Sequence, residues 1–338
     1  MKKSLLALAV LGAFAGVASA QSSVTIYGLL DMSAAKANGG TAPNAGSPGA
    51  TEAWHVQQSA GSRLGFRGNE DMGGGLSAQF QIEHRFNPDS GALSNSTVFW
   101  QGRSYVQLTS KAAGSVYLGR EYTPAFWPAV KSDPFGWDGV GQAGASQWAG
   151  YLTPASAGTG TGGVRMPNNV GYRSPNWGGL TVQAAVSASE TSGLGRSQGF
   201  NVEYAGGPIY AALGYEDVAG GTNDGQGVTN VAFHWDFGFA KLIAYYAMAS
   251  VGAGGNTDAN NILIGARIPL AGGVIKLQGN RTTTELASGD VELTKYGVGY
   301  DYPLSKRTNL YVDFGQGKSS VSGVTNNSAY AFGVKHTF

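Results

Sequence analysis

The chain has 338 residues, 13% of them charged, and its 22 lysines and arginines nearly balance its 21 aspartates and glutamates. This near-neutral charge excludes the strongly basic composition that indicates a nucleic-acid partner. The chain has no cysteine, which excludes disulfides.

Residues 1–20 have the pattern of a cleaved secretory signal. Lys2 and Lys3 precede an apolar run that ends in Ala18-Ser19-Ala20, a small-x-small site for signal peptidase. The run is shorter than the roughly 20 residues that a membrane-spanning helix needs. We therefore expect an exported mature chain, residues 21–338, that forms a single domain.

The mature chain has the composition of a strand-rich protein. No long apolar run remains after residue 20, which excludes a helical membrane protein. The chain holds 54 glycines, 16 tyrosines, 14 phenylalanines and 7 tryptophans. A helical globule would instead favour Leu, Glu and Lys. This mix indicates many short strands, tight turns and exposed aromatic surface.

Alternation of apolar and polar residues begins at residue 24 and recurs sixteen times. A period of two with one apolar face is a strand signal. The apolar face carries aromatic residues near the strand ends, as membrane-surface girdles do, whereas the other face is polar and often charged. A dry soluble core could not tolerate that second face. A soluble β-sandwich is the alternative fold.

The connections alternate between short turns and longer loops. The seven short ones are 71–75, 110–114, 176–179, 205–208, 236–238, 269–273 and 303–307. The eight long ones are 32–60, 87–96, 122–164, 191–197, 218–226, 250–258, 284–290 and 317–327. Short turns on one side and long loops on the other are typical of outer-membrane barrels. We predict an all-β fold, a 16-stranded antiparallel transmembrane β-barrel.

The third long loop, 122–164, is the longest segment without sustained alternation. Loops of this length are usually functional. Its aromatic residues include Phe126, Trp127, Trp137 and Trp148, which indicate that it packs against something. We predict that it folds into the lumen of the barrel and narrows a water-filled hole.

Basic residues dominate the predicted inward face. They are Arg63, Arg67, Arg103, Arg165, Arg173, Lys241, Arg267, Lys276, Lys295 and Lys335, against Asp31, Glu83, Glu203, Glu216, Asp301 and Asp313. The inserted loop adds Asp133 and Asp138. These residues are either ordinary solvated lumen charges or a basic wall that faces an acidic loop.

Arg120 does not fit this pattern. Strict alternation from Val116 and Leu118 would turn Arg120 toward lipid, at a cost of roughly 2–4 kcal/mol. A β-bulge at Gly119 would instead turn the Arg120 side chain toward the lumen. We predict a bulge and an inward Arg120.

Two short motifs match catalytic or cofactor-binding patterns, but the strands and helices that such sites need do not surround them. The G-x-G-x-x-G at 158–163 has no strand before it, and the G-x-S-x-G at 195–199 continues as a strand where a nucleophile needs a helix. The four histidines show no metal spacing. We therefore expect no enzyme, no cofactor and no metal site.

Several motifs between residues 22 and 338 together resemble the general diffusion porins of Gram-negative outer membranes, of the beta-proteobacterial type. They are Ser62-Arg63-Leu64-Gly65-Phe66-Arg67-Gly68, Glu70-Asp71-Met72-Gly73-Gly74-Gly75-Leu76, Leu118-Gly119-Arg120, Asn169-Val170-Gly171-Tyr172-Arg173-Ser174-Pro175, Leu304-Ser305-Lys306-Arg307-Thr308 and Lys335-His336-Thr337-Phe338. The resemblance implies a sixteen-stranded homotrimeric pore with its third loop inside. It implies a basic wall of Arg63, Arg103, Arg120 and Arg165, and a terminal Phe338 that is read by the barrel-insertion machinery.

The residues and the resemblance together predict an outer-membrane porin. We expect passive diffusion of small hydrophilic solutes and ions, with a mild preference for anions because basic residues are in excess. A substrate-specific channel on the same barrel is the first alternative. The others are an outer-membrane hydrolase, which the failed serine motif disfavours, and a soluble secreted binding protein.

Overall fold

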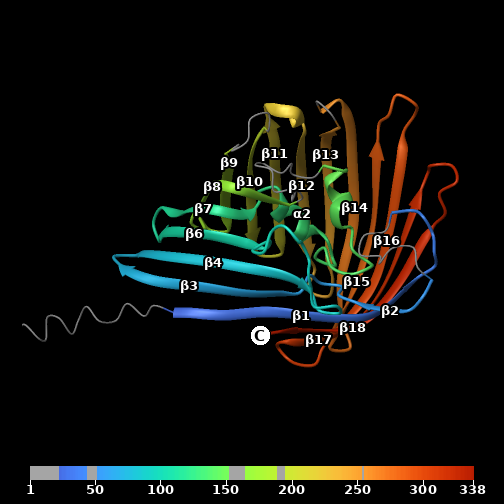
Figure 1. Ribbon diagram of the computed structural model, residues 1–338, viewed down its shortest axis with the longest axis horizontal. Coiled ribbons are helices and arrows are strands. Elements are labelled where there is room, and N and C mark those ends of the chain that lie inside the picture. The colour runs from blue at the N-terminus through green and yellow to red at the C-terminus, as the bar shows by residue number, and fades with distance from the viewer. Residues whose placement is uncertain (1–22, 44–51, 152–163, 189–194, 253–254) are drawn as a thin grey trace, which may run out of the picture.

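A computed structural model of the protein describes residues 23–43, 52–151, 164–188, 195–252 and 255–338, and strands are its main regular elements (Figure 1). The sixteen long strands in this part are β1 (Ser23–Ala37), β3 (Arg63–Gly73), β4 (Leu76–Asn87), β6 (Arg103–Ser110), β7 (Gly114–Tyr122), β8 (Arg165–Arg173), β9 (Leu180–Ser187), β10 (Arg196–Gly206), β11 (Ile209–Ala219), β12 (Gly227–Asp236), β13 (Lys241–Val251), β14 (Thr257–Leu270), β15 (Gly273–Thr284), β16 (Val291–Pro303), β17 (Thr308–Ser319) and β18 (Asn327–Thr337). Short elements in the connections are β2 (His55–Gln57), β5 (Ala92–Leu93), α2 (Phe126–Ser132), η1 (Gly144–Trp148) and η3 (Gly221–Asn223).

The long strands form one closed antiparallel sheet. Each pairs with the next long strand along the chain, and β18 returns to pair with β1 from Leu29↔Thr337 to Ala37↔Ala329. The first half of β1 pairs with β3, so the closing strand has a neighbour on both sides. The predicted 16-stranded antiparallel barrel is confirmed.

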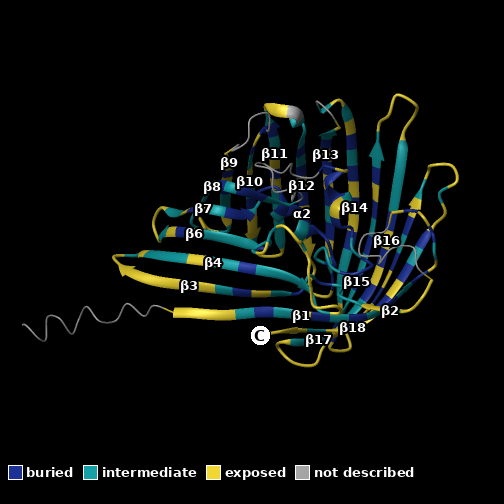
Figure 2. Ribbon diagram, viewed as in Figure 1, coloured by how far each residue is buried: buried dark blue, intermediate teal, exposed yellow. Residues whose placement is uncertain are grey.

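Apolar residues face outward on this barrel. On β17, Leu310, Val312 and Phe314 are exposed while the alternate residues Tyr311 and Asp313 are buried. Figure 2 shows the same banding of exposed and buried positions along several strands. An exposed apolar surface of this extent suits a lipid environment, because a soluble sandwich would bury it.

The inner face departs from the prediction over β12–β14, where it carries a patch of apolar side chains between the polar Asn230, His234 and Asn261. A buried cluster joins this patch to the inserted segment through Phe126, Ala129, Trp148, Ala232, Ile243, Tyr245, Ala247 and Leu263. Burying a side chain of the size of Phe126 stabilises the fold by about 1.5–3 kcal/mol. The patch is therefore the surface against which α2 and η1 pack.

Polar contacts fix the rest of the described inserted segment, 122–151, to neighbouring strands. Gln278 Nε2 donates to the Gly141 carbonyl at 3.0 Å, and Lys295 Nζ donates to the Ala143 carbonyl at 3.0 Å. Gly315 lets the backbone approach closely, because a Cβ there would overlap the Val140 carbonyl oxygen. The segment therefore lies against the inner face of the sheet, as Figure 1 shows for α2.

Two predictions concern residues that the structure does not describe. The signal, residues 1–20, lies outside the described residues, and so does 152–163 of the predicted pore loop. Within the described ranges, the helices are too short and too polar to cross a membrane.

Candidate functional site

A cavity of about 670 Å³ lies between one wall of the barrel and the inserted segment. Its charged lining comprises what we call the arginine cluster, together with two carboxylates, those of Glu83 and Asp138. The arginine cluster is Arg63, Arg67, Arg85, Arg103 and Arg165, from β3, β4, β6 and β8. Five positive charges against two negative ones leave a positive excess in a confined space, which attracts anions.

Aromatic side chains form the facing side of this cavity. We call Tyr122, Phe126, Trp127 and Trp137 the aromatic wall, since all four line the cavity. Phe126 stacks on Tyr122 with ring centroids 4.5 Å apart and meets Trp137 edge to face at 5.1 Å. These mutual contacts hold the rings in fixed positions.

The arginine cluster and the aromatic wall touch each other. The Arg103 guanidinium lies 5.4 Å from the ring centroid of Trp127, and that of Arg165 lies 4.3 Å from the Tyr122 ring. Such cation–π contacts orient a guanidinium without neutralising its charge.

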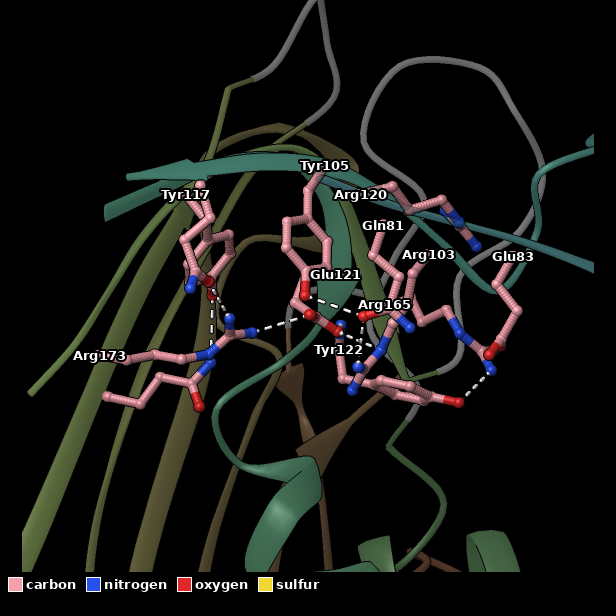
Figure 3. Close-up of polar contacts among 12 residues, drawn as sticks. Gln81, Glu83, Arg103, Tyr105, Tyr117, Arg120, Glu121, Tyr122, Arg165 and Arg173 are labelled. Atoms are coloured by element: carbon pink, nitrogen blue, oxygen red, sulfur yellow. Dashed lines mark hydrogen bonds and ion pairs between the residues drawn. The ribbon is translucent and has the colours of Figure 1, made fainter. Parts of the chain in front are cut away.

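Glu121 is a buried carboxylate behind the cluster. Its Oε1 lies 3.1 Å from Arg103 Nε, and its Oε2 lies 2.8 Å from Arg173 Nη2 (Figure 3). Glu121 belongs to no motif in the sequence, although alternation with the outward Val116 and Leu118 turns it inward. One carboxylate therefore fixes two arginines.

Arg85 is a further member of the cluster that sequence reasoning missed. Its Nη2 lies 2.8 Å from Glu83 Oε1 and also donates to the Tyr122 hydroxyl at 3.1 Å. Strand alternation does predict its direction, because Arg85 follows Glu83 by two residues and therefore lies on the same face of the sheet.

Arg63 and Arg67, like Arg165, make no ion pair among the described residues. Among the described residues, no carboxylate lies within ion-pair distance of either guanidinium. Arg63 Nε donates to the Gly61 carbonyl at 3.1 Å, and the Arg67 guanidinium lies 5.5 Å from the Tyr27 ring centroid. Both arginines can therefore offer N–H donors to an anion.

Arg120 lies apart from the cavity and is not among its lining residues. The register does shift between Gly119 and Glu121, but the extra residue belongs to β8, while Arg120 keeps its regular pairing with Ser104. The side chain is buried, and its Nε donates to the Gln101 carbonyl at 3.0 Å. The residues just before β6 therefore contact Arg120, and Figure 3 shows its side chain outside the Glu121 ion pairs.

Asp133 holds the inserted segment together and does not face the arginines. Its carboxylate is buried and accepts backbone N–H donors from Phe135 and Ala143, both at 2.9 Å, and from Trp137 and Gly144, both at 3.2 Å. These four bonds saturate the carboxylate, and Asp133 is not among the lining residues.

Asp138 does line the cavity. Its Oδ2 lies 4.0 Å from Lys335 Nζ, and a third of its side chain is exposed. Burial by the surrounding protein raises the pKa of Asp138 to about 6, against the opposing attraction of Lys335 and Arg63. Asp138 is therefore a carboxylate whose charge changes near neutral pH.

The last residue closes the barrel. Phe338 and Gly28 exchange two backbone hydrogen bonds, of 3.1 and 3.2 Å. In the described ranges, no group of three or more His, Cys, Asp or Glu side chains is arranged to hold a metal ion.

Comparison with known proteins agrees with this architecture. A family model described as Gram-negative porin matches residues 7–322. The chain is 33% identical to outer membrane porin protein 32 of Delftia acidovorans over 355 residues, which cover 99% of this chain and 95% of that protein. The solved anion-selective porin from Comamonas acidovorans is 28% identical, with a TM-score of 0.75 and coverage of 94% of this chain and 100% of that one.

A more distant solved structure shares the fold. The in-vitro folded outer-membrane protein OmpT of Vibrio cholerae, in a trimer form, is 14% identical with a TM-score of 0.64. The match covers 94% of this chain and 99% of that one.

Proposed function

The chain belongs to the family of Gram-negative porins, and we propose that its channel mildly favours small anions because of the arginine cluster. As a member of this family, it lies in the outer membrane and is a passive diffusion channel rather than an enzyme. The observation that carries the proposal is the lining of five arginines against two carboxylates.

The mechanism needs no covalent step. An anion that leaves bulk water exchanges some hydration for guanidinium donors, of which Arg63 and Arg67 have no carboxylate partner among the described residues. Two unit charges about 4 Å apart attract by only about 1 kcal/mol in water, and salt screens them beyond about 8 Å. The preference is therefore mild and decreases as salt concentration rises.

We infer that the inserted segment 122–164 sets the bore. The anchoring of 122–151 to the inner face supports this role, because a fixed segment narrows a lumen and a loose one does not. Asp138 then stands at the constriction opposite the cluster, whereas Asp133 contributes by keeping the segment folded. The basic wall comprises Arg63, Arg67, Arg85, Arg103 and Arg165.

The remaining proposals concern assembly. We propose a mature domain, 21–338, that is exported with loss of residues 1–20 and inserted through recognition of Phe338. We further propose a homotrimer surrounded by outer-membrane lipid, with the trimer form of the Vibrio cholerae protein as support by analogy of fold. The anion-selective Comamonas porin supports the proposed preference in the same way.

Planar-bilayer recording tests this function. Single-channel conductance should rise in proportion to KCl concentration, as expected of a water-filled hole without tight binding. A reversal potential in a KCl gradient should have the sign of chloride permeation. Conductance that saturates at low salt would favour the substrate-specific channel, and cation selectivity would refute the proposed role of the arginines.

A further inference from the structure

We propose that the cavity between the arginine cluster and the aromatic wall is a weak binding site for aromatic carboxylates such as benzoate. The channel would then hold an aromatic carboxylate more strongly than an aliphatic one of the same charge. This inference rests on the proposed anion preference and names the class of solute that the same cavity selects.

The charged half of the site consists of the three arginines of the cluster that make no ion pair among the described residues, which are Arg63, Arg67 and Arg165. Arg63 and Arg67 lie on one strand and line the cavity without a carboxylate partner among the described residues. A planar guanidinium matches a carboxylate in a two-bond geometry that a spherical ion cannot use. Arg85 and Arg103 already have carboxylate partners, so the three arginines without an ion pair are the first to accept the incoming carboxylate.

The second half of the site is apolar, and an inorganic ion gains nothing from it. Trp127 and Trp137 are half-buried and line the cavity, so part of each indole faces its open space. Phe126 braces both, at 5.7 Å from the Trp127 ring and 5.1 Å from the Trp137 ring. Rings held in this way offer edge and face contacts to a further ring without being ordered on binding.

The two halves are contiguous. The Arg165 guanidinium, which makes no ion pair among the described residues, lies 4.3 Å from the Tyr122 ring, and the neighbouring Arg103 guanidinium lies 5.4 Å from the Trp127 ring. A ligand whose carboxylate is attached directly to a ring can therefore reach an arginine and an indole at once. The cavity, about 670 Å³, is within the usual range for small-molecule sites.

Block of the chloride current by two organic anions distinguishes binding through an aromatic ring from simple attraction of a negative charge. Benzoate and cyclohexanecarboxylate have the same charge and similar size, but only benzoate has a π face. We expect benzoate to reduce chloride conductance at a concentration roughly 2- to 10-fold lower than cyclohexanecarboxylate does. Cyclohexanecarboxylate is the more apolar of the two, so simple hydrophobicity predicts the opposite order.

Variants of Trp127 locate the effect. Trp127→Leu should remove the difference between the two anions, whereas Trp127→Phe retains a ring and should retain it. Trp177→Leu, at an exposed position in the turn before β9, should behave as the wild type. If the leucine variant does not fold, the comparison of the two anions in the wild type still decides.

The outcomes distinguish this inference from the function on which it rests. Equal block by the two anions in the wild type would overturn the aromatic site and leave the anion preference standing. An unchanged difference in a folded Trp127→Leu variant would also overturn it. Cation-selective current before any carboxylate is added would refute the underlying preference.

Discussion

Arg103 Nε lies 3.1 Å from Oε1 of the fully buried Glu121, next to the point where β7 ends and the inserted segment begins. The same carboxylate holds Arg173 at 2.8 Å. Glu121 therefore positions one arginine of the cavity while it reduces the positive charge available to an anion.

Glu121→Gln should increase anion preference and lower stability. The amide keeps the shape of the side chain, but both arginines lose their counter-charge, so the reversal potential in a KCl gradient should shift toward that of chloride. The arginines are a fifth to a quarter exposed, and the free energy of unfolding should fall by about 1–3 kcal/mol. Denaturant unfolding in detergent measures this loss.

Glu292→Gln is the matched control for that variant. Its ion pair with Arg281 is 3.5 Å long and half-exposed, so its loss should cost about 0–1 kcal/mol and leave selectivity unchanged. An unaltered reversal potential in Glu121→Gln would show that the buried carboxylate does not control the charge of the cavity.

Anion preference should increase as pH falls through the pKa of Asp138, which is about 6. Above that pH the ionised carboxylate offsets part of the arginine charge, and below it the neutral acid does not. The same raised pKa makes the folded state less stable as pH rises from about 3.8 to about 6. Charged groups that face Asp138 include Lys335, Arg63, Asp31 and Lys276.

Reversal potentials at about pH 7.5 and about pH 4.5, on either side of this pKa, measure the effect. In Asp138→Asn the shift between the two pH values should be smaller, since one titrating group is lost. A shift as large as that of the wild type would mean that Asp138 does not face the permeating ions.

Gly315→Ala should lower single-channel conductance. The new Cβ would overlap the Val140 carbonyl oxygen, so the inserted segment has to move away from β17 and into the open lumen. Gly279→Ala is the control, because its Cβ would make only an ordinary contact of 3.6 Å with Tyr296. Equal conductance in the two variants would argue against a bore set by the inserted segment.

The strands and their facing could be predicted from the sequence because lipid imposes one apolar face on every strand. Regular alternation also put Arg63, Arg67, Arg103 and Arg165 on the inner face, and the structure gathers these four at one cavity. Glu121 and Arg85 follow the same rule and were missed only because no further signal distinguished them.

The contacts of the loops could not be predicted, because they depend on packing between distant segments. Arg120 is covered by a loop nineteen residues before it, at Gln101, and no local pattern reveals that contact. Asp133 is saturated by amides up to eleven residues away within its own segment. The apolar inner patch is visible in the sequence, because residues Leu242 to Ala249 of β13 form a nearly unbroken apolar run that does not alternate with polar residues.

The reversal potential of Arg63→Gln/Arg67→Gln in a KCl gradient tests the central claim most directly. Both substitutions remove a positive charge of the cavity that forms no ion pair among the described residues, whereas Lys111→Gln removes a positive charge from an exposed turn. We predict that the double variant loses most of the anion preference, with a potential much nearer zero, because three arginines then face two carboxylates, while wild type and Lys111→Gln remain anion-selective. An anion preference in the double variant equal to that of the wild type would contradict the account.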